Sequence, residues 1–222
     1  MKKIILLILL LLTLFGYSQR WEMATGVHYV NTEGQSITFR RVNNYLEYKL
    51  IDADAKLFCI FFGGGLNLPI YSFSDEMNIG IQANALVSTV ASASNDGLSG
   101  PGFNFNTSGY LAYNYGAASS YETEMPIGFG FGLGYQYSFY MIDNLHEPGD
   151  NGGLYSYATP TFMAQVSNLW LFSNLIIRYE VQLGGNRYLK NDVNGHEFGY
   201  NFMQQTISII VYTNRNKNSI KY

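Results

Sequence analysis

One stretch of the chain, residues 125–142 (MPIGFGFGLGYQYSFYMI), limits most strongly what it can fold into. From residue 127 onward, large apolar or aromatic residues alternate with glycine or polar residues. Successive side chains of a β-strand point to opposite faces, so this stretch predicts a strand with one large apolar face and one small or polar face. A helical repeat of about 3.6 residues does not fit it. Because the second face carries no charge, the pattern is typical of a strand in a transmembrane β-barrel.

The alternation recurs in residues 77–88 and 174–184, so it also predicts which way individual side chains point. We expect the apolar face of these strands to meet lipid, namely Ile127, Phe129, Phe131, Leu133, Leu175, Ile177, Tyr179 and Val181. We expect the polar face to line the barrel lumen, namely Gln82, Asn84, Gln136, Asn174, Arg178, Glu180 and Gln182.

The amino-terminal segment has the features of a secretory signal peptide. Lys2 and Lys3 precede an unbroken apolar run, and small residues stand at positions 16 and 18, so we expect cleavage after Ser18. The apolar run is shorter than the roughly 20 residues that a spanning helix needs. Position 19 is Gln and not Cys, which removes the attachment site of a lipoprotein. We therefore divide the chain into a signal peptide (1–18), a barrel (19–213) and a polar periplasmic tail (214–222).

Composition supports a membrane barrel and excludes other classes. Charged residues make up 13% of the chain, about half the usual share of a soluble domain, and 19 residues are Tyr, which suits the boundary between membrane and water. In hydrocarbon only helices and closed barrels satisfy every backbone polar group, and no second apolar run is long enough for a helix. A signal peptide with a barrel indicates the bacterial outer membrane. No basic cluster points to nucleic acid.

Turn signals divide the rest of the chain into strands. We predict an all-β fold, an antiparallel barrel of eight strands at residues 36–51, 56–73, 77–88, 107–116, 125–142, 156–167, 174–184 and 197–213. The glycines at 63–65 suggest a bulge or bend, and the last strand shows an apparent phase slip between Phe202 and Gln205. The long loops at 89–106, 143–155 and 185–196 alternate with short turns, which places them outside and both termini in the periplasm.

Residues 20–31 form a weaker strand that does not fit this count. A chain that begins and ends in the periplasm must cross the membrane an even number of times. The segment is therefore either an extra piece beside an eight-stranded barrel or half of an additional hairpin in a barrel of ten strands.

Three features resemble the small outer-membrane β-barrel proteins of Bacteroidota: the Tyr-Ser-Gln at residues 17–19, the PIGFGFGLGY strand at 126–135, and loops rich in Tyr and Asn. The resemblance covers the mature chain and implies an antiparallel barrel inserted by the outer-membrane assembly machinery. As partners of such a barrel we expect outer-membrane lipid and lipopolysaccharide, with other envelope proteins as further candidates. It implies no activity, because that group is functionally mixed. Such barrels commonly end at an aromatic residue, whereas here polar residues follow Tyr212, so we expect an internal insertion signal.

The predicted lumen allows more than one interpretation. Arg178 and Glu180 could form a charged constriction of a pore, or paired charges in a packed lumen; an eight-stranded barrel is only wide enough for side chains to fill it. The inward glycines at 128, 130, 132 and 134 could border a cavity for a ligand or a lipid chain. They could instead pack closely against large residues from across the barrel, or against residues 20–31 folded inside.

Function is less constrained than fold. His146 and His196 lie in or beside the outer loops near acidic residues and are weak candidates for catalytic bases, as in barrel enzymes that edit lipid A. No Ser in a nucleophile context accompanies them, and no zinc or calcium motif is present, so we expect no metal and no cofactor. The leading hypothesis is a non-enzymatic barrel with a structural, adhesive or accessory role in an envelope complex. The alternatives are a small lipid-modifying hydrolase or acyltransferase, and a narrow channel.

Overall fold

The computed structural model describes residues 20–42, 45–52, 55–94, 102–119, 125–142, 153–170, 173–184, 186–191 and 197–212. The predictions for 1–18 and 214–222 therefore lie outside the described residues. The strands are β1 (Arg20–Val42), β2 (Tyr45–Asp52), β3 (Ala55–Ser74), β4 (Met77–Ser94), β5 (Phe103–Gly116), β6 (Ile127–Ile142), β7 (Gly153–Trp170), β8 (Ser173–Gln182), β9 (Asn186–Asn191) and β10 (Glu197–Tyr212). No helix among these residues is long and apolar enough to cross a membrane.

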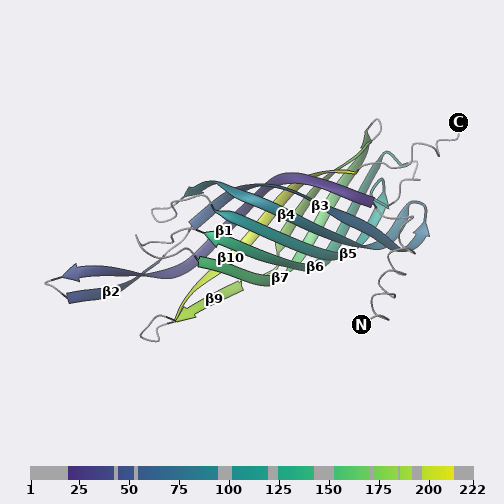
Figure 1. Ribbon diagram of the computed structural model, residues 1–222. Coiled ribbons are helices and arrows are strands. Elements are labelled where there is room, and N and C mark those ends of the chain that lie inside the picture. Colours follow the sequence, from purple (N-terminus) through teal and green to yellow (C-terminus); the bar gives the residue numbers. More distant parts are fainter. Residues whose placement is uncertain are drawn as a thin grey trace, which may run out of the picture.

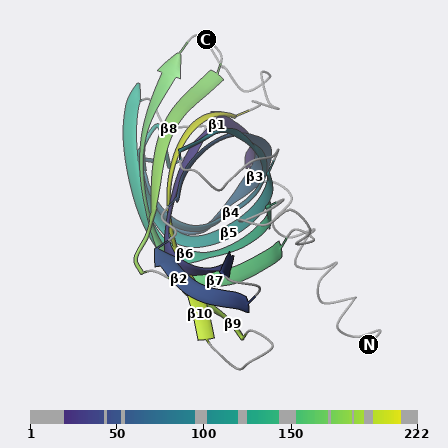
Figure 2. The same cartoon turned by 90° about the vertical axis from the view of Figure 1, so that its left-hand side faces the viewer.

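Eight of these strands close into an antiparallel barrel (Figures 1 and 2). The order around the ring is β1-β3-β4-β5-β6-β7-β8-β10, and pairing of β1 with β10 closes it. The two remaining strands do not enter the ring: β2 pairs with the far end of β1, and β9 with the far end of β10. The predicted eight-stranded barrel is confirmed.

The first strand of the barrel is not the one that we predicted. The segment 20–31 is neither an extra piece nor half of an additional barrel hairpin, since it pairs with β3 on one side and with β10 on the other. The predicted strand 36–51 is instead a hairpin between β1 and β2 outside the ring. The number of barrel strands stays at eight, because the ring loses one predicted strand (36–51) and gains one that was not assigned to it (20–31). The sequence signal at 20–31 is weak because its lumen-facing positions are unusually mixed, including Glu22, Ala24 and His28.

The short and the long connections lie at opposite ends of the barrel. The turns after β3, β5 and β7 share one end with the start of β1 and the end of β10, where Glu22 pairs with Tyr212. We call this the turn end. Gly116, at a positive φ of 59°, begins the turn after β5, and its N–H donates to the carbonyl of Glu76 in the neighbouring turn over 2.8 Å. The opposite end, the loop end, carries the β1–β2 hairpin and β9 (Figure 1).

Three finer expectations are corrected. No bulge occurs at glycines 63–65, which keep an unbroken register with β4; the register shifts of β3 lie between Phe58 and Cys59 and beyond Pro69. Part of the predicted loop 185–196 is strand β9. The phase slip in the last strand is absent, because β10 pairs with β1 in one continuous register from Tyr200 to Tyr212. The even-numbered aromatic residues near 200 belong to the part of β10 that pairs with β9.

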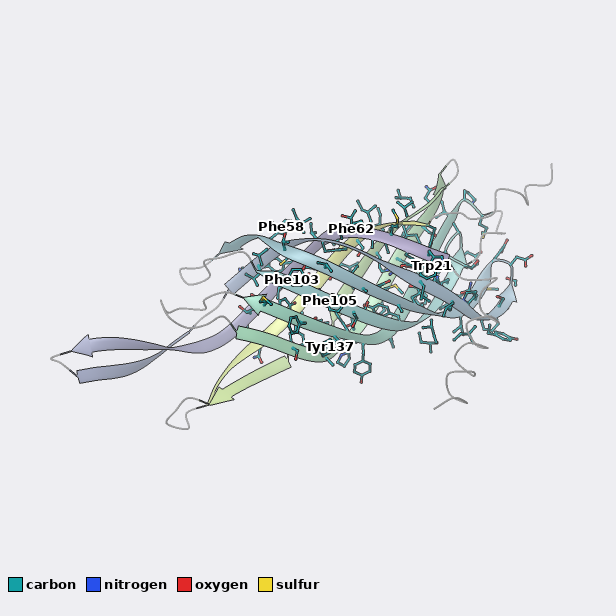
Figure 3. The ribbon with its side chains drawn as sticks, viewed as in Figure 1. Trp21, Phe58, Phe62, Phe103, Phe105 and Tyr137 are labelled. Carbon is teal, nitrogen blue, oxygen red and sulfur yellow. The ribbon has the colours of Figure 1, made fainter. Side chains whose placement is uncertain are left out.

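The barrel is apolar outside and polar inside, the reverse of a soluble protein. Aromatic and aliphatic side chains cover the outer wall, as shown by Trp21, Phe58, Phe62 and Tyr137 in Figure 3. Along β6 the even positions from 128 to 140 are buried or half-buried, and odd positions such as Phe131 and Leu133 are exposed. Exposed apolar walls around a closed ring are stable only in hydrocarbon, so this is a transmembrane barrel.

The glycines of β6 are covered by their neighbours. A β-carbon on Gly130 would lie 3.0 Å from the amide nitrogen of Gln165, and one on Gly132 would lie 3.1 Å from the terminal methyl group of Met163. At Gly134 a β-carbon would overlap the carbonyl oxygen of Gly109, so the adjacent strand approaches too closely for any side chain. These glycines allow close packing, and the neighbouring strands β5 and β7 fill the space. Residues 20–31 are not folded inside the barrel, since they form part of its wall.

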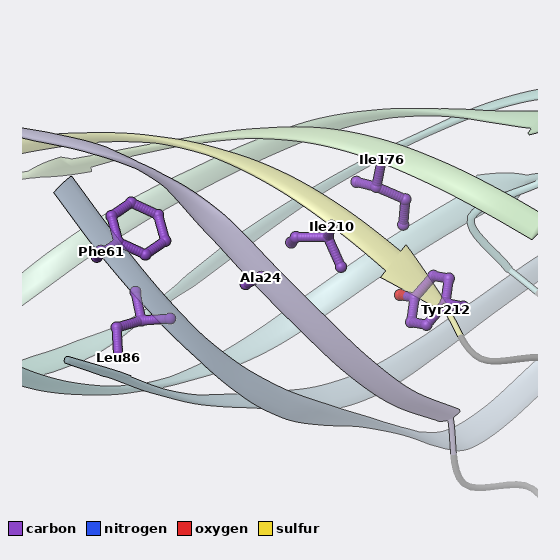
Figure 4. Packing of buried hydrophobic residues seen from close by; sticks show 6 residues of the cluster. All are labelled: Ala24, Phe61, Leu86, Ile176, Ile210 and Tyr212. Carbon is purple, nitrogen blue, oxygen red and sulfur yellow. The ribbon is translucent and has the colours of Figure 1, made fainter. Parts of the chain in front are cut away.

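A small apolar cluster also lies inside the barrel (Figure 4). Its members come from β1, β3, β4, β8 and β10, and they are Ala24, Phe61, Leu86, Ile176, Ile210 and Tyr212. All are less than 5% exposed. The lumen is therefore a packed interior in which polar and apolar side chains are both enclosed.

Phe131→Arg should test the outer wall. Arg within the apolar belt should lower the unfolding free energy by about 2–4 kcal/mol. The matched control is Ile127→Arg, which follows the turn before β6 and should cost about 0–1 kcal/mol near the interface. Gly132→Arg should fail for another reason, overpacking against Met163. Urea unfolding in lipid vesicles measures all three, and equal costs at Phe131 and Ile127 would contradict the assigned belt.

Candidate functional site

The polar lumen is the part of the molecule with the most chemistry. Six of the seven predicted lumen residues are buried: Gln82, Asn84, Gln136, Arg178, Glu180 and Gln182. The seventh, Asn174, lies in β8 and pairs through its backbone with Tyr212 of β10, and its side chain lies outside the described residues. Of the predicted lipid-facing residues, Ile127, Phe129, Phe131, Leu133, Ile177 and Tyr179 are exposed and Leu175 and Val181 are half-buried. The lumen also contains two ionisable residues whose inward position the sequence did not predict, Glu22 and His28.

Arg178 forms the electrostatic centre of the lumen. Its Nη2 lies 3.0 Å from each carboxylate oxygen of Glu22, and its Nε donates to the side-chain oxygen of Gln165 over 3.0 Å. The hydroxyl of Tyr212 donates to the same Glu22 carboxylate over 2.9 Å. Arg178, Tyr212 and Glu22 stand on β8, β10 and β1, so this group bridges the place where the ring closes. It is the one ion pair among the side chains that the structure describes.

A chain of amides continues from Arg178 toward the turn end. Gln165 donates to Asn114 over 2.9 Å, Gln82 donates to the same oxygen over 3.2 Å, and Asn114 donates to Asn78 over 3.1 Å. Asn78 then donates to the carbonyl of Ser119. Residues 117–119 are themselves buried, so the turn after β5 is packed against this chain of amides. The network therefore reaches the turn end without a gap in hydrogen bonding.

Glu180 is held from the opposite wall. Asn84 on β4 donates to its carboxylate over 3.3 Å and also lies 3.4 Å from the hydroxyl of Ser108. In the ring β4 and β8 are diametrically opposed, so this contact spans the full width of the barrel. The interpretation of Arg178 and Glu180 as a mutual pair is thus incomplete, because Arg178 forms its ion pair with Glu22.

His28 organises a second polar group nearer the loop end. Its Nδ1 lies 2.8 Å from the hydroxyl of Thr206 and 3.0 Å from the amide nitrogen of Gln204, and its Nε2 lies 3.3 Å from the amide of Asn106. The ring stacks on Phe61 at a centroid distance of 4.3 Å. Gln204 is also contacted by the hydroxyl of Tyr140. The imidazole is fully enclosed.

This arrangement does not favour acid–base catalysis. A His beside a hydroxyl is the first half of a nucleophile pair, but Thr206 is about as buried as His28, and the other partners of the ring are amides. Among the described residues no group of three His, Cys, Asp or Glu side chains could hold a metal. His146 and His196 lie outside the described residues, so the structure places neither of them.

Glu22 and His28 could have been found in the sequence. From Trp21 to Thr32 the odd positions are exposed or half-buried and the even positions are buried or half-buried, the same alternation as in β6. The signal is weak because the lumen face of this segment mixes Glu22 and His28 with small and apolar residues. In a barrel the lumen face is where such groups belong.

Three solved structures are similar to this chain at a low level. The attachment invasion locus protein Ail of Yersinia pestis is 9% identical, with 86% of this chain and 98% of that chain covered and a TM-score of 0.37. Neisserial surface protein A is 10% identical (86% and 96% covered, TM-score 0.41), and the outer membrane protein OprG of Pseudomonas aeruginosa is 10% identical (88% and 96% covered, TM-score 0.43). No family model and no curated protein matches the chain.

These values are too low to transfer a function, so we base the placement on the barrel itself. The ring is closed, it has an even number of antiparallel strands, its outer wall is apolar, and its short turns share one end with both termini of the ring. Barrels of this construction belong to the bacterial outer membrane, where the short turns face the periplasm. The protein is an eight-stranded outer-membrane β-barrel.

Arg178→Met should show how strongly the closing strands depend on the central ion pair. The variant leaves the Glu22 carboxylate buried without its cation, which should lower the unfolding free energy by about 3–5 kcal/mol. Glu22→Gln combined with Arg178→Met removes both charges and should recover much of that loss. Lys56→Met, an exposed cation on β3, is the control and should change little. A double variant less stable than Arg178→Met alone would contradict this account.

Proposed function

We propose that this protein is a non-enzymatic surface protein, in which the barrel is a rigid support for contacts made at its loop end. The observation that carries the proposal is the hydrogen bond between Asn84 and Glu180, which joins opposite walls of the barrel at 3.3 Å. A lumen that is spanned by side chains supports neither the passage of solutes nor the entry of a substrate. What remains available to partners is the outer surface, and its most extended part is the β1–β2 hairpin (Figure 1).

The hairpin is continuous with the wall. β1 runs for 23 residues, and only its first part, up to Gly34, is paired with β10. The remainder pairs with β2 in the register of the β1–β3 ladder, so that ladder of the barrel wall extends outward along the continuous strand β1. A binding element on a continuous strand is held more precisely than one on a loop. This favours an adhesive or accessory role, with lipid and lipopolysaccharide around the wall and another envelope or surface component at the hairpin.

The Tyr-Ser-Gln segment and the PIGFGFGLGY strand support an origin in Bacteroidota as part of the same proposal. Within that setting the hairpin faces the outside of the cell.

Shortening the hairpin tests this function. Replacement of residues 36–51 by Asn-Gly removes the part of β1 and β2 beyond the barrel and leaves the ring pairings in place. We expect the variant barrel to fold and to reach the outer membrane, because the ring keeps its pairs. Cells that display it should lose contact with each other or with test surfaces relative to cells that display the unchanged protein. Full contact after the shortening would contradict the proposal.

The two alternatives have their own readouts. A narrow channel would give conductance steps in planar bilayers, and we expect none because the lumen is spanned. A lipid-modifying enzyme would change the lipid A or phospholipid profile of cells, and we expect no change. A difference that disappears in His146→Ala or His196→Ala would show that the protein is an enzyme after all.

A further inference from the structure

The β1–β2 hairpin leaves a free strand edge outside the membrane. β2 stands at one end of the sheet order and, among the described residues, pairs with β1 alone. A two-stranded ribbon is marginally stable by itself. Its unpaired edge presents a row of backbone donors and acceptors that can accept another strand. The closed ring has no such edge, so among the described strands the sheet can be extended at β2 and at β9, which pairs with β10. β9 (NRYLKN) contains two basic residues and no acid, so we look to β2 for an edge with complementary charges.

The sequence of β2 is nearly symmetric about Tyr48. Leu46 and Glu47 precede it and Lys49 and Leu50 follow it, so apolar residues stand two positions away on each side and opposite charges stand one position away. In antiparallel pairing of two such strands about Tyr48, Glu47 of each copy stands opposite Lys49 of the other. Leu46 stands opposite Leu50 in the same way. Both kinds of pair occur twice, so the edge is complementary to itself.

We propose that β2 pairs edge to edge with β2 of a second copy of this chain, forming a four-stranded sheet. The complementary charges select this edge rather than that of β1. Residues 35–42 of β1 contain two arginines and no acid, so that edge offers no equivalent match. The register about Tyr48 is the one in which both charged pairs and both leucine pairs form together.

Hydrogen-bond parity agrees with that register. Val42 and Tyr45 form the last pair of the hairpin, with two residues between them, and we expect such a pair to exchange both hydrogen bonds. Alternate residues of β2 then bond to β1: Tyr45, Glu47, Lys49 and Ile51. The backbone groups of Leu46, Tyr48 and Leu50 are left at the outer edge, as pairing about Tyr48 requires. Glu47 and Lys49 consequently meet in the closer, non-hydrogen-bonded kind of pair.

The direction of the hairpin decides where the second copy sits. The hairpin leaves the barrel roughly along the barrel axis, as the side view and the end view both indicate (Figures 1 and 2). Antiparallel strands point in opposite directions, so the two barrels lie at opposite ends of the shared sheet. Two barrels in that relation belong to two facing membranes. The contact is therefore between neighbouring cells, a homophilic adhesion that rests on the proposed surface function and makes it more specific.

Nanodiscs with one full-length barrel each provide the test, because two joined discs report a contact between facing membranes. Analytical ultracentrifugation at micromolar protein and low salt should show pairs of discs for the unchanged protein. Lys49→Glu gives an edge with Glu at both positions and should weaken pairing at least about fivefold, since like charges then stand opposite each other. The combination Arg40→Glu with Glu47→Lys gives an edge with Lys at both 47 and 49, and residues of opposite charge still stand at positions 40 and 47, which are partners in the register of the hairpin. It should weaken pairing similarly.

Mixing the two variants is the decisive step. Lysines at 47 and 49 of one copy then stand opposite glutamates at 49 and 47 of the other, so mixed pairs of discs should form about as well as unchanged ones. Lys56→Glu and Glu33→Lys make the same charge changes at exposed positions outside the hairpin and should leave pairing unchanged.

Three outcomes would overturn the proposal: single discs only for the unchanged protein, no mixed pairs, or equal weakening by the two control variants. A loss of cell contact on shortening the hairpin, combined with any of these, would leave the surface function in place with a different partner. Retention of cell contact after shortening would instead remove the surface function itself.

Discussion

The structure depends on one constraint: the first and the last strand of the barrel must pair with each other. In hydrocarbon an open sheet edge leaves a row of backbone groups without partners, and each such group costs several kcal/mol. The ladder between β1 and β10 removes both edges at once. The Arg178–Glu22 pair, with Tyr212, links the side chains of the three strands that meet there. Buried charges are tolerable at this position because each has its partner, and the same charges would destabilise a mismatched register.

Closure also explains the composition of the lumen. With eight strands the interior is only wide enough for side chains, so every inward position must be filled by something that fits. Side chains such as those of Met163 and Gln165 are compatible with that width because β6 contributes glycine at 132 and 130, where a β-carbon would crowd them. The polar character of the filling then follows from amides that bond to one another across strands, as in the chain Gln165–Asn114–Asn78. Small residues in the wall and bulky residues in the lumen therefore compensate for each other in volume.

The sequence predicted the fold class and strand number, and the reason lies in the alternation of β6 and β8, where lipid selects one face so strictly that few other patterns are possible. It misplaced the first strand because hairpin and wall share the same period of two residues. Local signals were present in residues 36–51: adjacent Arg40 and Arg41 put a charge on both faces of a strand, and Asn43-Asn44 is a turn signal. Pairing with β3 and β10 shows that 20–34 is the wall. Contacts such as Asn84 with Glu180, 96 residues apart, depend on ring order and tilt, which no single strand encodes.

The β1–β2 hairpin shows how an unpaired strand edge is tolerated outside the bilayer. Within the membrane an unpaired strand edge is too costly, and closure of the ring leaves none. Beyond the rim, water can bond to the backbone groups of an edge. β1 therefore continues past Gly34 with β2 as its only described partner. Such an edge is a hazard in most proteins because it can pair with any exposed strand. Glu47 and Lys49 restrict that hazard, since a foreign strand has no reason to present the complementary charges in the same order. The charge pattern through which we propose that two copies pair thus also makes the edge selective.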